Sequence, residues 1–279
     1  MISVPSMQEL LEAGVHFGHQ VRRGNPRMKP YIYGVRDGVH IIDLAKSEEM
    51  LKEAAQAAYD LGKDGKVMML VGTKKQAKEI VESLAKEVDT PYLNSKWVGG
   101  LLTNWEEIKK NIKKLNGLQE EQEKGTLSRY TKKEQLLIAR KLQKFHSMLG
   151  GMSGQEKIPD ALFIIDAPAE ITAVKEAQRM GLIMIGFADT NSDPGWMDYP
   201  VAANDDGIKS IKLIAETIVR AYGEGKKAAG VKAAAEAKKA ADDVKADDGV
   251  LSDPVADETA AIEEEVEKQV VQESSRKVE

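Results

Sequence analysis

Residues 20–36 combine five cationic side chains with no acidic residue, and they are the part of this chain best suited to binding chemistry. The same stretch holds Asn25, two prolines, and the aromatic residues Tyr31 and Tyr33. Cations on a stiff loop, with aromatic rings beside them, suit a phosphate backbone and unstacked bases. The stretch therefore predicts a nucleic-acid contact. Its members are Arg22, Arg23, Asn25, Arg27, Lys29, Tyr31 and Arg36. A solvated basic loop without a ligand is the alternative.

A second basic region covers residues 104–149, with 11 Lys/Arg against 6 Asp/Glu. Apolar residues recur there in steps of three or four, from Trp105 to Leu118 and again from Ile138 to Leu149. This spacing predicts two antiparallel helices packed along one apolar seam, with lysines outside. The residues added here to the RNA-binding prediction are Lys96, Trp97, Asn104, Lys109, Lys110, Lys113, Lys132 and Lys133. Two alternatives stay open: the lysines only solubilise the hairpin, and the tryptophans only anchor it.

Paired histidines and loop aspartates leave a divalent-cation site open. Carboxylate loops at strand ends can hold a hard cation such as magnesium, with a histidine as a further ligand. The candidate ligands are His16, His19, Asp189, Asp193 and Asp205. The alternative is that the aspartates cap helices and form Asx turns. This alternative is the favoured one, and Asp205 and Asp206 stand just before a predicted helix, where caps are expected.

Catalytic motifs are missing from the sequence. The turn at residues 72–75 lacks the GxxxxGK[ST] spacing, and no GxGxxG follows an apolar segment. Ser153 lies in GMSGQ, which is not GxSxG, and no cysteine is present to act as a nucleophile. We therefore expect no enzyme and no organic cofactor. The main alternative is a flavodoxin-like enzyme that binds a sugar phosphate or nucleotide at the strand ends. A second is a scaffold that binds another protein through the hairpin.

Alternating apolar runs and helical periods predict the elements that position these residues. The dipeptide Asp37-Gly38 between short apolar runs indicates a β-hairpin. Strands are predicted at 67–71, 91–94, 161–165, 183–187 and 199–202, and helices at 44–62, 75–87, 169–180 and 206–222. This order predicts a layered, Rossmann- or flavodoxin-like α/β fold with a parallel sheet.

The predicted organisation has three parts. Residues 1–103 and 150–222 form a discontinuous α/β domain, residues 104–149 form the inserted hairpin, and residues 223–279 form a flexible tail. The tail holds 9 Lys/Arg and 15 Asp/Glu, so the net charge of −5 for all 279 residues hides a nearly neutral body. With no cysteine, no signal-like N-terminus and no long apolar run, we expect a cytoplasmic protein without membrane contact.

Eight motifs in series resemble the bacterial small-subunit ribosomal protein two family over residues 3–222. They begin with LLEAGVHFGHQVRRGNPRMKPYIYGVRDGVHIIDL, VMMLVGTKKQA, WVGGLLTNW and the segment Gly125 to Glu134, and continue with LGG, PDALFIIDAPAE, GFADTNSDP and NDDGIKSI. The chain departs from the family pattern at Ala202-Ala203 and at Gly195-Trp196-Met197, so the turn geometry there is not carried over.

The resemblance implies a Rossmann-like domain with a helical insertion, bound to small-subunit rRNA at the back of the head–body junction. It also implies neighbouring ribosomal proteins as partners, among them the large mRNA-binding ribosomal protein one. The family's basic stretch matches Arg22 to Lys29, its TNW element matches Thr103 to Trp105, and its TKKE element matches Thr131 to Glu134. The function expected is that of a structural constituent of the small subunit that supports translation.

Overall fold

The computed structural model describes residues 3–125 and 130–247. Its contacts divide the chain into two units, Met1–Val231 and Lys232–Glu279, and the first contains the fold described below. Within the described ranges, no helix combines the length and apolar character needed to cross a membrane.

A five-stranded parallel sheet forms the centre of the first unit. Its strands are β4 (Met68–Val71), β5 (Tyr92–Leu93), β6 (Ala161–Ile164), β7 (Ile183–Phe187) and β8 (Tyr199–Val201). They lie in the order β5-β4-β6-β7-β8, and every neighbouring pair is parallel. Counted along the chain this is the order 2-1-3-4-5, which is typical of flavodoxin-like folds. The predicted fold class is confirmed.

Both faces of the sheet are covered, and the alternation of side chains decides which residues enter which core. Met68, Leu70 and Phe163 pack with α2 (Leu44–Lys63), α3 (Lys78–Glu87) and α7 (Ile208–Asp247). Their neighbours Met69, Val71 and Leu162 pack on the opposite face with α6 (Ile171–Met180) and with the segment 97–112. All residues of β4 and β6 are buried, as their unbroken apolar runs predict.

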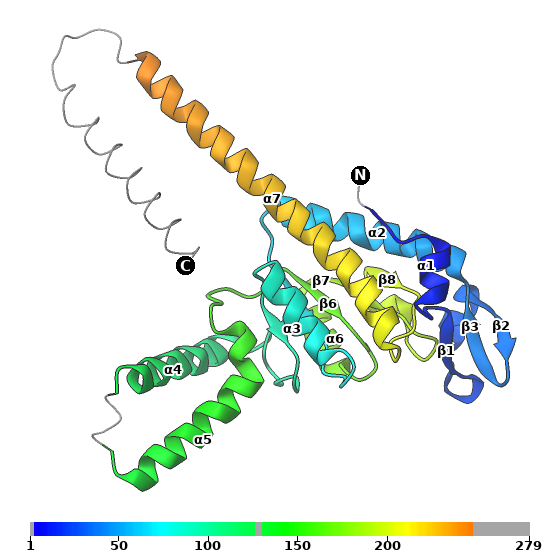
Figure 1. The fold of residues 1–279 in the computed structure, drawn as a ribbon, viewed down its shortest axis with the longest axis horizontal. Helices are drawn as coiled ribbons and strands as arrows, with labels where there is room; N and C mark the ends of the chain where they lie inside the picture. The colour runs from blue at the N-terminus through cyan, green and yellow to red at the C-terminus, as the bar shows by residue number, and fades with distance from the viewer. Residues whose placement is uncertain (1–2, 126–129, 248–279) are drawn as a thin grey trace, which may run out of the picture. The chain divides into compact units, whose positions relative to one another are not determined.

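A small antiparallel sheet precedes the parallel one, with strands β1 (Phe17–Gln20), β2 (Ile32–Arg36) and β3 (Val39–Ile42) in the order β1-β3-β2 (Figure 1). Asp37 and Gly38 both have positive φ, 51° and 75°, as the predicted two-residue hairpin turn requires. Before the sheet lies α1 (Met7–Glu12), which Ser6 and Glu9 close with a capping box. Between β1 and β2 the basic residues lie on two 3-10 turns, η1 (Val21–Arg23) and η2 (Pro26–Tyr31).

Helices α4 (Trp105–Glu123) and α5 (Lys132–Leu149) lie side by side at the positions of the predicted hairpin (Figure 1). Ile112 and Leu142 are buried, at 2% and 8% exposure, and supply part of its apolar seam. Thr131 and Glu134 form the capping box that starts α5. The short turn η4 (Gly150–Met152) follows α5 and leads back to β6.

The last helix is longer than predicted. The sequence analysis ends it at residue 222, whereas α7 runs to Asp247. Two glycines allow its close approach to α2, because a Cβ on Gly225 would lie 2.1 Å from the carbonyl oxygen of Tyr59. A Cβ on Gly62 would lie 2.3 Å from that of Tyr222. Residues 223–226 therefore pack in the body. The part of the predicted tail beyond residue 247 lies outside the described residues.

Helix α3 also starts later than predicted, at residue 78. The amides of Ala77 and Lys78 both donate to the carbonyl oxygen of Lys74, which makes residues 74–77 a tight turn. Helix α6 likewise starts at residue 171 rather than 169.

Replacing Gly225 by alanine should lower the free energy of unfolding by about 1–3 kcal/mol, because the new methyl group has no room between α2 and α7. Urea unfolding of the full chain measures the change. Gly230→Ala in the same helix is the matched control, since no atom lies within 4 Å of the added Cβ. It should be neutral or stabilising by up to about 1 kcal/mol. Equal losses in both variants would contradict the close packing.

Candidate nucleic-acid interface

The basic N-terminal segment is fastened to the loop that follows β7. Thr190 makes two of the contacts: its hydroxyl oxygen accepts from the His19 amide at 2.7 Å, and its carbonyl oxygen accepts from the Asn25 amide at 2.7 Å. At Gly18 a Cβ would lie 2.5 Å from the Thr190 methyl carbon, so a glycine is needed there. These contacts hold residues 18–25 against the sheet edge.

Arg27 adds an ion pair to the same loop. Its Nη1 lies 2.6 Å from Oδ2 of Asp193, whose other oxygen accepts from the Gly195 amide at 3.0 Å and caps η5 (Pro194–Trp196). The Asp193 side chain is 11% exposed and that of Arg27 is 70% exposed. The pair thus orients the guanidinium while leaving most of it open to solvent. Asp193 is therefore paired with Arg27, and it is not among the converging candidate ligands for a cation that are described below.

The structure divides the predicted RNA-binding residues of this segment into two groups. Arg22, Arg23 and Lys29 are exposed, and Arg36 is 85% exposed with only a 3.8 Å contact to Asp37. The other two have structural roles. Asn25 caps η2 by accepting from the Arg27 amide, and Tyr31 is half-buried against the core.

Tyr33 is the exposed aromatic residue that the predicted set omits, with 81% of its surface open. It lies on β2 next to the half-buried Ile32. Because successive side chains of a strand point to opposite faces, strand alternation could have identified it.

On the hairpin the predicted lysines face outward, with Lys113, Lys132 and Lys133 exposed and Lys109 partly covered. Lys110 is exposed as well, and its ammonium lies 2.6 Å from Glu107. Such a surface pair contributes little to stability and opens readily for another anion. Lys96 and Asn104 are also exposed.

Trp97 is not on the surface, and its assignment to the RNA-binding set is corrected here. It is 7% exposed, and its indole nitrogen donates to Glu176 at 3.1 Å. The same carboxylate accepts from the backbone amides of Gly100, Leu102 and Thr103. Trp97 therefore anchors the base of the hairpin, as the alternative reading proposed.

Glu176 is the residue that fixes this base. Burial by itself would raise the pKa of Glu176, but the hydrogen bonds from Trp97 and from the three amides outweigh it and hold the pKa below its ordinary value. The carboxylate is thus charged at neutral pH while it satisfies backbone amides that have no helical partner. No sequence signal marks Glu176 beyond its place in a helix.

An acidic cluster lies at the carboxyl ends of the parallel strands, next to the tethered segment. Asp166 follows β6, Asp189 follows β7, and Asp205 and Asp206 follow β8. Lys74, which follows β4, reaches into the cluster. Its Nζ lies 3.0 Å from Asp166, 2.6 Å from Asp205 and 2.7 Å from Asp206. The sequence analysis missed Lys74, although carboxyl ends of parallel strands always meet at one edge of a sheet.

One ammonium shared by three carboxylates sets the protonation of the cluster. Burial alone would lower the pKa of Lys74, yet the neighbouring carboxylates, Asp205 foremost, raise it above its ordinary value. Burial raises the pKa of Asp205 to about 7, with Asp189 and Asp166 adding to the shift against the pull of Lys74. Lys74 therefore stays charged at neutral pH. Asp205 stays protonated as the pH rises from acid values until it approaches about 7.

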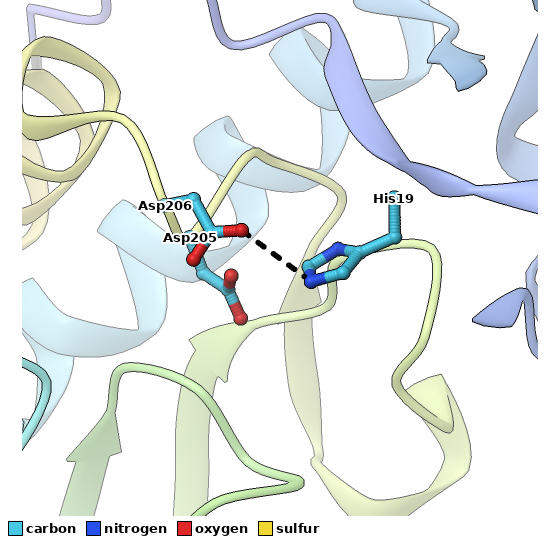
Figure 2. Close-up of side chains that lie close together, drawn as sticks. All are labelled: His19, Asp205 and Asp206. Carbon is cyan, nitrogen blue, oxygen red and sulfur yellow. Dashed lines mark ion pairs between the residues drawn. The ribbon is translucent and has the colours of Figure 1, made fainter.

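His19, on β1, lies beside the carboxylates of the cluster (Figure 2). Its Nδ1 lies 3.1 Å from Asp189 and its Nε2 lies 3.4 Å from Asp206. The contact with Asp189 raises the pKa of His19 in spite of its partial burial. Ligand atoms of His19, Asp205 and Asp206 lie within 4.8 Å of one another, so three carboxylate and imidazole groups converge.

His16 is separate from this group, which corrects its place among the candidate ligands. Its ring packs 4.0 Å from that of Phe17, and burial lowers its pKa. Of the predicted ligands, the structure thus brings together His19, Asp189 and Asp205, adds Asp206, and leaves out His16 and Asp193.

A family model described as "Ribosomal protein S2" matches residues 10–225, which cover the parallel sheet, the hairpin and the tethered basic segment. The chain belongs to this family. The family resemblance that the motifs predict is confirmed. Because the family is one of structural ribosomal proteins, the alternative of a flavodoxin-like enzyme is wrong.

Relatives from distant organisms match over most of the chain. Small ribosomal subunit protein uS2 of Nitratiruptor sp. is 47% identical over 222 residues, which cover 80% of this chain and 83% of that protein. The uS2 protein of Wolinella succinogenes is 45% identical, covering 81% and 83%. The uS2c protein of Mesostigma viride is 42% identical, covering 79% and 97%.

The raised pKa of Asp205 predicts a pH-dependent difference between the protein and its Asp205→Asn variant. Between about pH 4 and pH 7 the folded state holds a proton that the unfolded state has lost, so the stability of the wild type falls as the pH rises. Relative to the variant, we expect a decline of about 1–3 kcal/mol that levels off above pH 7. Urea unfolding at several pH values, with EDTA present, measures it. Parallel curves for the two proteins would refute the protonation assignment.

Proposed function

We propose that this protein is a structural constituent of the small ribosomal subunit that binds rRNA through two basic surfaces. The first is the tethered N-terminal segment, with Arg22, Arg23, Arg27, Lys29 and Arg36. The second is the hairpin with the residues leading into it. Its members are Lys96, Asn104, Lys109, Lys110, Lys113, Lys132 and Lys133.

The separation of charges supports this proposal most directly. The carboxylates of Asp189, Asp193 and Asp205 beside the N-terminal segment are buried against His19, Arg27 and Lys74, and the more exposed Asp206 also contacts Lys74. Arg22, Arg23 and Lys29 are left exposed toward solvent. Local field rather than net charge decides whether RNA binds, so a chain of net charge −5 can still present a cationic face.

The partner surfaces follow from the same division. Residues 157–222 carry 6 Lys/Arg and 10 Asp/Glu, and this excess of acidic residues suits neighbouring proteins. We propose other small-subunit proteins there, with ribosomal protein one among them, on cytoplasmic ribosomes.

Joint replacement of Arg22, Arg23 and Arg27 by alanine should weaken binding to small-subunit rRNA and flatten its salt dependence. Each lost phosphate contact removes about 0.7–0.9 from the slope of log affinity against log salt, so the slope should fall by roughly 2 to 3. Filter binding at several KCl concentrations measures the slope.

The matched control removes three cations from the acidic half, as Lys175→Ala, Arg179→Ala and Lys209→Ala. The control removes the same number of positive charges as the arginine variant. Because all three side chains are exposed, the fold should tolerate the change. We expect the control to keep the wild-type slope. A slope that changes as much in the control as in the arginine variant would refute the assignment of the site.

We also propose that His19, Asp205 and Asp206 hold a divalent cation. The strongest support is an oxygen of Asp205 that lacks a partner. Its Oδ2 is buried and has no hydrogen-bond partner within the described ranges, while its Oδ1 faces Lys74. Asp206 likewise offers Oδ2 toward His19 and Oδ1 toward Lys74. A cation can therefore lie opposite the ammonium. An imidazole with two carboxylates favours zinc or manganese over magnesium.

Metal analysis of the purified full-length chain, after dialysis against zinc and manganese, tests the cation. The wild type should retain about one ion per chain, and His19→Ala and Asp205→Asn should lose it. His146→Ala, on the exposed side of α5, serves as the control and should retain the ion. Equal metal content in all four proteins would end this proposal.

A further inference from the structure

A crevice of about 520 Å³ opens at the carboxyl edge of the sheet, apart from the acidic cluster. The ends of three strands line it: Thr73 follows β4, Ser95 and Lys96 follow β5, and Ala169 and Glu170 follow β6. Its volume lies in the range of pockets that hold small ligands. None of the N-terminal arginines lines it, and of the hairpin surface proposed above only Lys96 does.

Its position is the topological switch point of the sheet. From β4 the chain order runs outward to β5 on one side and to β6 on the other. The connections leave the two central strands in opposite directions at this place, which opens a gap between the loops after β4 and β6. Doubly wound sheets bind their ligands in this gap. The geometry alone therefore marks a ligand position, without naming the ligand.

Two lysines give the crevice its chemistry. Lys78 and Lys96 both line it and are exposed, and among residues 3–125 and 130–247 neither forms an ion pair with a carboxylate. In contrast, Lys74 in the neighbouring turn is fully occupied by its three aspartates. Two ammonium groups, one on the first residue of α3 and one on the segment after β5, suit an anion with several oxygens.

Backbone and hydroxyl donors point to the same kind of ligand. The ten-residue helices α3 and α6 both begin at the crevice, and neither N-cap side chain makes a capping hydrogen bond. The amide of Lys78 at the start of α3 already donates to the Lys74 carbonyl oxygen, so the backbone donors for an anion come from the first turn of α6, where the helix dipole also favours negative charge. The buried hydroxyl of Ser95 also has no hydrogen-bond partner in the described part of the chain.

Glu170 is the single acidic residue in the lining of the crevice, and its side chain is almost entirely covered by protein. It is only 4% exposed, and its carboxylate accepts a hydrogen bond from the Thr73 hydroxyl. Burial raises the pKa of Glu170, although the hydrogen bond from Thr73 opposes the shift.

We propose that this crevice is a binding site for a phosphate group, held by Lys78, Lys96, Ser95 and the first turn of α6. The phosphate belongs to a nucleotide, either free or within an RNA strand, because the volume exceeds that of a bare phosphate ion. The site is separate from the arginine surface proposed above, and its role is to bind rather than to convert.

NMR titration of the full-length protein with three probes tests the proposal. The probes are inorganic phosphate, AMP and a 12-nucleotide single-stranded RNA, and the readout is the shift of the Ile171 and Thr172 amide signals. Ala169→Trp fills the crevice without changing charge. The double variant Lys78→Ala, Lys96→Ala removes the cations and should weaken binding at least about tenfold. Lys75→Ala is the control, since its exposed side chain lies outside the lining.

Shifts with AMP, larger than those with inorganic phosphate, that Ala169→Trp and the double variant abolish support a free nucleotide as the ligand. Shifts that only the RNA causes, with the same dependence on the variants, support a phosphate within a strand. The proposal is overturned if no probe moves the two signals, or if both variants bind like the wild type. Each outcome is independent of the arginine triple variant, whose salt slope reports on the other surface.

Discussion

The ammonium of Lys74 lies within ion-pair distance of Asp166, Asp205 and Asp206, and this cluster ties the ends of β4, β6 and β8 together. Parallel strands deliver their following residues to one edge, where like charges would repel without a shared cation. Asp189 extends the cluster by accepting from the Asp205 amide and by contacting His19. The acidic edge is thereby turned into an attachment point for the N-terminal segment.

That attachment explains how one short stretch can present cations in a defined direction. Backbone bonds to Thr190 fix residues 19–25, and the ion pair with Asp193 orients Arg27. The entropy cost of ordering a basic loop is then met during folding rather than during binding. Next to this segment Asp189, Asp193 and Asp205 are buried while Arg22, Arg23 and Lys29 are exposed, so the charges do not cancel locally although the chain as a whole is acidic.

The sequence was sufficient where local pattern decides the structure. The apolar runs of β4 and β6 and the turn at Asp37-Gly38 are local signals, and all of them form as predicted. Contacts between residues far apart in the chain were missed. Lys74 meets Asp205 across 131 positions, and Trp97 meets Glu176 across 79. The end of α7 was misplaced because the composition of residues 223–279 indicated a flexible tail, whereas Gly223 and Gly225 allow α7 to pack closely against its neighbours.

Helix α6 connects the proposed phosphate crevice with the base of the hairpin. Its first turn borders the crevice, and Glu176, one and a half turns later, holds the loop from which the hairpin starts. A buried carboxylate with four nitrogen donors leaves that loop little freedom, because moving it would strand either a charge or several amides. The rigid spacing of α6 therefore fixes the distance between crevice and hairpin base. A sheet fold common among enzymes thus serves here as a frame that holds separate cationic groups in register.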